Sequence, residues 1–121
     1  MILQAAMAEQ QAHQLEENLQ LVDAQITELE EFNRNLKTLR DSKEKEMLSQ
    51  LGKRVYIKTK IEDREKLFVE VGAGVVVKKT PEETIKIVSN QISRLQEAKV
   101  QILSQLNVHH TQLQEFLEMV R

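Results

Sequence analysis

Apolar residues recur at alternating spacings of three and four in both halves of the chain. The N-terminal half carries this pattern at Leu15, Leu19, Val22, Ile26 and Leu29. The C-terminal half repeats it at Ile85, Val88, Ile92, Leu95, Ile102, Leu106, Leu113, Phe116 and Val120. Such a heptad pattern is typical of coiled-coil helices, where one narrow apolar stripe packs against a partner helix. The sequence therefore predicts two long amphipathic helices.

The two stripes can be aligned in opposite directions, which predicts an antiparallel helical hairpin. Pairing residues whose numbers sum to about 131 places Leu15 opposite Phe116 and Leu19 opposite Leu113. Lys99 then faces Phe32 or Asn33 and serves as a register device, its stem packed and its ammonium in water. This register also leaves the first ten or so residues projecting beyond the second helix, without an intramolecular partner.

Between the stripes the apolar period changes to two, which indicates β-strands. Val55, Ile57 and Ile61 alternate with polar residues, and so do Leu67, Val69 and Val71 after a polar turn at 62–65, which predicts a hairpin. A further short strand follows at Val75, Val76 and Val77, and a weaker one is possible near Met47 to Leu51. We expect one α+β unit over residues 1–121: a helix over 1–50, a β module over 51–79 and a helix over 80–121.

The second helix has a clear start signal. Thr80 is placed as the N-cap, Pro81 occupies the first helical position, and Glu83 completes a capping box. The strands before it are too few to form a stable sheet alone, and their unpaired edges favour pairing with another chain. We therefore expect the strands of several subunits to assemble into a barrel, through Val55, Ile57, Ile61, Leu67, Val69, Val71, Val75, Val76 and Val77.

Composition narrows the functional classes. The formal charge of −2 shows no global bias toward nucleic acid or anionic membranes, and the basic pairs Lys53-Arg54 and Lys78-Lys79 lie beside acidic residues. Cysteine is absent, and no apolar run approaches the roughly 20 residues of a membrane span. With no signal-peptide pattern at the N-terminus, we expect a cytosolic protein. No nucleophile–base pair or carboxylate dyad indicates an enzyme.

Two local features could suggest small ligands, and simpler structural explanations are favoured for both. The Gly72-Ala73-Gly74 segment follows a strand but lacks the third glycine and the helix of a dinucleotide site, so a turn or bulge is favoured. His109 and His110 point in different directions on a helix, and the expected register puts His13 several turns away. We therefore expect neither a metal nor a cofactor.

The order of elements resembles that of the α-type subunit of prefoldin, in its archaeal form. The resemblance covers the long helix, Leu51-Gly52, Val55-Tyr56-Ile57-Lys58, the segment from Val69 to Lys79, and the capped second helix. The roughly 30-residue connection also favours the α-type over the β-type. One departure is that Ser49 to Arg54 replaces the family's usual proline and second glycine around the first turn.

The resemblance implies a hexamer of two α-type and four β-type subunits that captures non-native polypeptides without ATP and passes them to a group II chaperonin. Binding of these clients would then lie at the ends of the hairpin, where ordinary fraying is the competing explanation. A coiled-coil scaffold without chaperone activity and a nucleic-acid-associated hairpin are the alternative functions. The expected client-binding residues are Ile2, Leu3, Met7, Phe116, Leu117, Met119 and Val120.

Overall fold

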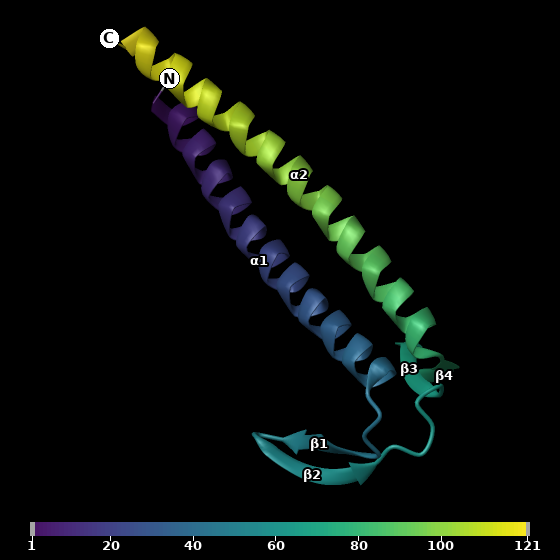
Figure 1. Ribbon diagram of the computed structural model, residues 1–121. Coiled ribbons are helices and arrows are strands. Elements are labelled where there is room, and N and C mark those ends of the chain that lie inside the picture. The colour runs from purple at the N-terminus through teal and green to yellow at the C-terminus, as the bar shows by residue number, and fades with distance from the viewer. Residues whose placement is uncertain (1, 121) are drawn as a thin grey trace. The chain divides into compact units, whose positions relative to one another are not determined.

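The computed structural model describes residues 2–120 and contains two helices and four strands (Figure 1). The elements are α1 (Ile2–Asp41), β1 (Glu46–Gly52), β2 (Val55–Lys60), β3 (Leu67–Gly72), β4 (Val75–Lys79) and α2 (Pro81–Val120). This confirms the predicted fold class of two long helices joined by a small β module. The chain divides into two compact units, one formed by residues up to Glu30 and from Asn90 onward, the other by Glu31–Ser89.

The predicted heptad stripes are confirmed as the shielded faces of both helices, except at Val120, which is 63% exposed. In the first unit every third or fourth residue of each helix is less exposed than its neighbours, with Ala12, Leu106 and Ile26 most deeply buried. In the second unit the stripes continue through Leu36 and Val88. The pattern also includes positions that are not large and apolar: Ala5, Ala8, Ala12, Asn33, Lys99 and His109.

The predicted pairing of the stripes is wrong by about ten residues. Lys99 forms an ion pair with Asp23, and in the second unit Asn33 bonds to Ser89; both pairs have residue numbers that sum to 122. Lys99 therefore does not face Phe32 or Asn33. In this register Leu15 lies opposite Leu106 instead of Phe116.

The first helix is also shorter than predicted. It ends at Asp41 instead of residue 50, and Glu46–Gly52 form a strand in which Ser49 Oγ lies 2.8 Å from Thr59 Oγ1. Both errors are connected through the periodicity of the heptad stripes. Two such stripes can pack in several registers that differ by a few residues, so the lengths of the two helices decide which register forms. With residue numbers that sum to 122, Ile2 at the start of α1 lies opposite Val120 at the end of α2, so within residues 2–120 the predicted N-terminal projection is wrong.

The four strands form two separate antiparallel hairpins, β1 with β2 and β3 with β4. The predicted hairpin between β2 and β3 is therefore wrong. The segment between these strands is a polar linker in which the Glu65 N–H donates to Asp63 Oδ1, and it lacks the glycine that tight hairpin turns favour. The weak strand predicted near Met47 to Leu51 is confirmed as β1.

The two hairpins have the same register when one is shifted by 20 residues. Met47 pairs with Thr59 as Leu67 pairs with Lys79, and Gly52 pairs with Val55 as Gly72 pairs with Val75. Both turns hold two successive residues in the left-handed region. The φ angles are 44° and 67° at Lys53 and Arg54, and 52° and 76° at Ala73 and Gly74. These are the angles of type I′ turns, and they confirm Gly72-Ala73-Gly74 as a turn.

The start of α2 is confirmed where the sequence predicts it. Thr80 Oγ1 accepts a hydrogen bond of 3.1 Å from the Glu83 N–H, which satisfies one of the free donors at the helix start. The Glu83 carboxylate does not complete the capping box, because it lies 3.7 Å from Lys79 Nζ instead. No helix among residues 2–120 has the length and apolar character needed to cross a membrane.

Candidate functional site

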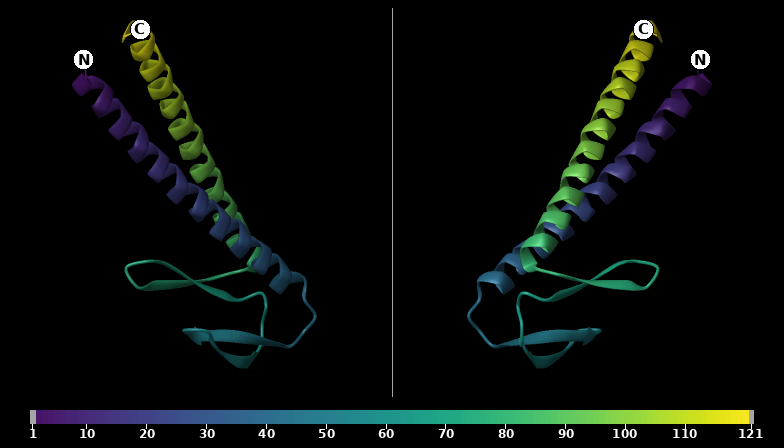
Figure 2. Two further views of the ribbon diagram at one scale, coloured as in Figure 1. Left: turned by 90° about the vertical axis from the view of Figure 1, so that its left-hand side faces the viewer. Right: turned by 90° about the vertical axis from the view of Figure 1, so that its right-hand side faces the viewer.

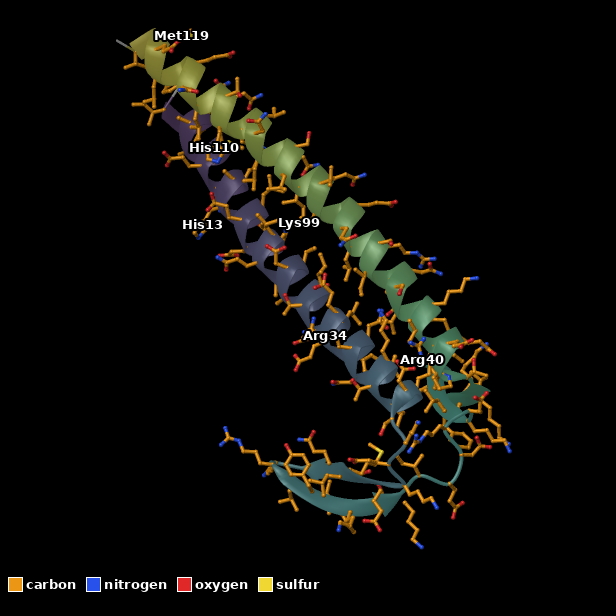
Figure 3. All side chains as sticks on the ribbon, in the orientation of Figure 1. His13, Arg34, Arg40, Lys99, His110 and Met119 are labelled. Carbon is orange, nitrogen blue, oxygen red and sulfur yellow. The ribbon has the colours of Figure 1, made fainter. Side chains whose placement is uncertain are left out.

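The ends of α1 and α2 that lie far from the β module along each helix expose a group of large apolar side chains. Ile2 is 85% exposed and Met119, labelled in Figure 3, is 75% exposed. Together with Leu3, Met7, Leu117 and Val120, they form what we call the terminal apolar group. A free apolar side chain in water can contribute roughly 1.5–3 kcal/mol when a partner buries it. Six of the seven predicted client-binding residues thus lie on the surface.

Phe116 differs from the rest of the predicted set because it lies in the seam between the helices. It is half-buried and lines a cavity of about 310 Å³ with Ala5, Ala8 and Leu113. The small alanine side chains of α1 face the two large residues of α2, which leaves this space incompletely filled. Figure 2 shows the two helices farther apart near the ends marked N and C. The seam is therefore incompletely filled close to the exposed apolar side chains.

The β module also exposes apolar side chains on both hairpins. Alternate residues point to opposite faces, so Leu48 and Tyr56 share one face of the first hairpin, and Phe68 and Val76 share the equivalent face of the second. All four are more than half exposed. Both hairpins are isolated two-stranded ribbons, so their outer edges keep unpaired backbone groups.

One face of the second hairpin is better shielded at the end away from its turn. Val69 and Val77 are half-buried, as are Ile61 and Leu67. A cavity of about 440 Å³ within the second unit brings Leu39 of α1 together with Met47 and Leu67, which are equivalent positions of the two hairpins. Of the nine residues predicted for oligomerisation, the exposed ones are Val55, Ile57, Val71, Val75 and Val76.

The sequence analysis missed several exposed apolar residues of the β module. Leu48 and Leu51 belong to β1, which was only weakly predicted, while Tyr56 and Phe68 occupy positions assigned to the polar face of their strands. The large aromatic side chains at alternate positions were the signal that could have identified them. In the helices, the exposed Leu21, Val100, Leu103 and Val108 were also missed because they lie off the seam.

The polar groups of the described chain form no obvious chemical centre. Residues 2–120 contain no group of three or more histidine or acidic side chains arranged to hold a metal ion. His109 Nδ1 is buried without a hydrogen-bond partner, and the observed register places it at the level of Ala12 and His13, not several turns away. Figure 3 labels His13, whose Nε2 lies 3.4 Å from Glu17 Oε1.

The pKa values that depart from their ordinary range belong to one exposed pair at the end of α1. Arg40 Nε donates to Asp41 Oδ1 at 3.0 Å and Nη2 donates to Oδ2 at 3.3 Å. These hydrogen bonds lower the pKa of Asp41 and raise the pKa of Arg40. The guanidinium thus compensates a negative charge at a helix C-terminus, where the helix dipole disfavours it.

Comparison with known proteins connects this arrangement to one family. The prefoldin family profile, described as "Prefoldin subunit", matches residues 8–121. The protein named prefoldin subunit alpha of Methanococcus vannielii is 30% identical over 97 residues, which cover 80% of this chain and 65% of that protein. The protein of the same name from Methanopyrus kandleri is 26% identical over 87 residues, covering 71% and 55% respectively. The chain thus spans between 55% and 66% of the length of these relatives.

A solved structure shares the fold over almost the whole chain. It is a cryo-EM structure of filamentous PFD from Methanocaldococcus jannaschii, with a TM-score of 0.82 and 21% sequence identity. The match covers 96% of this chain and 98% of that one. At this level of identity the match establishes the arrangement of helices and hairpins.

Proposed function

The chain belongs to the prefoldin family, and we propose that it is an α-type subunit of a chaperone that captures unfolded polypeptides without ATP. In this proposal the β module joins the chain to β-type subunits in a hexamer of two α-type and four β-type subunits. The helical hairpin then holds clients until they pass to a group II chaperonin. The proposed setting is the cytoplasm.

The observation that carries this proposal is the terminal apolar group. Ile2, Leu3, Leu117 and Met119 are each more than 60% exposed, although seam residues a few positions away are shielded. Unfolded chains expose apolar side chains without a fixed shape, and flexible methionine and aliphatic residues suit such variable contacts. Each contact is weak, so hairpins from several subunits would have to act together to hold a client.

The proposed assembly rests on the exposed face and edges of the β module. An unpaired two-stranded hairpin is marginally stable in water, and these two hairpins expose Leu48, Tyr56, Phe68 and Val76. Pairing with strands of neighbouring subunits would satisfy the edges and bury these side chains. The resulting intersubunit barrel would hold the hairpins of all subunits in one particle, which gives the avidity that capture requires.

The test of capture separates binding from assembly. Deleting residues 1–8, and replacing Leu117 with serine, should leave the hexamer intact by native mass spectrometry and weaken suppression of client aggregation. The matched control carries Leu21→Ser, an exposed apolar position of α1 outside the terminal apolar group. The β-type ends are trimmed in every sample to prevent compensation. If the trimmed hexamer protects several unrelated clients as well as the parent, the chain acts instead as a scaffold subunit without chaperone activity.

The test of assembly uses the exposed face of the second hairpin. Val76→Lys places a charge where we propose that a partner strand packs, and burying it unpaired would cost several kcal/mol. The variant should lose the hexamer while keeping its helical circular dichroism. Lys78→Val lies on the same face but removes a charge, so it should assemble normally. Normal sedimentation of the Val76→Lys variant with its β-type partners would show that the module is not the assembly core.

A further inference from the structure

The net charge of −2 conceals a strong separation of charge along the chain. Between residues 2 and 33 there is no lysine or arginine, and Arg34 is the first basic residue of α1. That stretch carries seven carboxylates: Glu9, Glu16, Glu17, Asp23, Glu28, Glu30 and Glu31. Residues 42–80, which contain the whole β module, hold ten basic and six acidic residues. The two regions of the molecule therefore present fields of opposite sign.

The second helix extends the acidic region. After Lys99 the next lysine or arginine in the sequence is Arg121, while Glu115 and Glu118 lie among the terminal apolar residues. Lys99 itself is neutralised by Asp23, with 2.8 Å between Nζ and Oδ1. The side chains of Glu9, Glu115 and Glu118 are exposed, so each carboxylate faces solvent. Apolar contacts and negative charge thus occupy the same ends of the helices.

This distribution is not what helix stability alone would select. Exposed helices gain stability from acidic and basic residues placed three or four positions apart, and like charges at those spacings are unfavourable. Residues 2–33 have no lysine or arginine that could form such pairs. A surface that only had to remain soluble could mix both signs. The single sign of charge in residues 2–33 is therefore best explained by a partner of opposite sign.

We infer that the terminal apolar group, with the carboxylates around it, selects unfolded polypeptides whose apolar side chains are accompanied by lysine and arginine. This inference rests on the proposed function and names the chemical class of its clients. Apolar burial supplies part of the affinity, and the carboxylates attract the cationic residues and increase the rate of encounter. The same field repels nucleic acids, anionic membranes and the acidic ends of a second copy.

The experiment reads out binding at the hairpin of this chain within the assembled complex. A photo-crosslinking amino acid replaces Met7, so that β-type hairpins do not contribute to the signal. Three labelled peptides share the same apolar positions and carry lysine, glutamine or glutamate between them. We expect the lysine peptide to crosslink at about fivefold lower concentration than the glutamate peptide at low salt, and the difference to shrink in high salt.

Matched variants assign the preference to specific carboxylates. Glu9→Gln, Glu115→Gln and Glu118→Gln together should remove most of the preference for the lysine peptide. The control combines Glu44→Gln, Glu62→Gln and Glu65→Gln, which changes the charge equally at exposed positions of the β module and its linkers. This control should keep the full preference.

The possible outcomes separate the two proposals. Equal crosslinking of the lysine and glutamate peptides, or an unchanged preference in the Glu9, Glu115 and Glu118 variant, overturns the charge selection and leaves chaperone capture standing. A failure of all three peptides to crosslink overturns capture at this site, and the charge selection with it.

Discussion

Lys99 Nζ lies 2.8 Å from Asp23 Oδ1, in an ion pair that joins the two helices (Figure 3). Lys99 occupies a position of the heptad that is otherwise filled by residues such as Leu95 and Ile102. Both partners are nearly half exposed, so the pair contributes only about 0.2–1 kcal/mol. It fixes the register only within one heptad, because a shift of seven residues would bring Glu16 or Glu30 to the position of Asp23.

The register itself can be tested by crosslinking within one chain. Ala8 and Leu113 line the same cavity, so cysteines at these two positions should react with one short bis-maleimide crosslinker. Cysteines at Leu19 and Leu113 should not, since in the observed register they lie about three turns of helix apart. Electrophoresis of the denatured chain measures the intrachain product. A product from the second pair but not the first would support the register in which residue numbers sum to about 131.

A second prediction concerns Asn33, the polar side chain in the seam of the second unit. It is 7% exposed, its Nδ2 donates to Ser89 Oγ at 3.0 Å, and its Oδ1 is buried without a partner. Asn33→Leu should raise the free energy of unfolding by about 1–2 kcal/mol, because it removes an unsatisfied acceptor and adds apolar burial. Asn33→Asp should lower it, because it buries a charge. Urea unfolding followed by helical circular dichroism measures both, and a destabilised leucine variant would contradict the prediction.

The sequence predicted which helices and strands form better than it predicted the residues at which they begin and end. Both helices could be identified from the three–four spacing of apolar residues, which burial in the seam requires, over Leu15 to Leu29 and Ile85 to Phe116. The sequence could not determine the register of the helices, since the stripes are nearly periodic and the register depends on the end of α1 at Asp41. The unbroken absence of glycine and proline up to Leu48 suggested a longer helix, whereas the Ser49–Thr59 contact favours a strand.

The candidate site was only partly predictable for a related reason. Exposure of Ile2, Leu3 and Met119 follows from apolar residues off the seam, which the sequence shows directly. The half-buried position of Phe116 cannot be derived from the sequence in this way, because it depends on which residues of α1 lie opposite Phe116. In the wrong register Phe116 met Leu15, and in the observed one it meets the small side chain of Ala5.

The Arg40–Asp41 pair predicts a specific pH response. The pKa of Asp41 is lowered in the folded chain, chiefly by its hydrogen bonds from Arg40. Its stabilising contribution is therefore present above the unfolded pKa and is lost as pH falls through the folded pKa. Because both side chains are exposed to solvent, the effect on stability is small. In Arg40→Gln the pKa of Asp41 should rise toward its ordinary range.

Carboxyl chemical shifts followed by NMR during an acid titration measure this change. Lys37→Gln is the matched control, because it removes one positive charge from the same end of α1 and leaves the pair intact. The titration midpoint of Asp41 should be unchanged in that control. An equal shift in both variants would mean that the general field of the helix end, not the hydrogen bonds from Arg40, sets the pKa.

The equivalence of the two hairpins gives the last prediction. Arg54 has a φ of 67° and occupies the turn position that Gly74 fills, with a φ of 76°, in the second hairpin. A residue with a Cβ is strained in this region, whereas glycine is not, although glycine also makes the unfolded chain more flexible. Arg54→Gly should therefore stabilise the first hairpin by about 0.5–1 kcal/mol, and Gly74→Arg should destabilise the second by a similar or larger amount. Thermal unfolding of the assembled complex measures both variants. A destabilised Arg54→Gly complex would mean that the Arg54 side chain makes contacts in the assembly that outweigh the strain of its backbone.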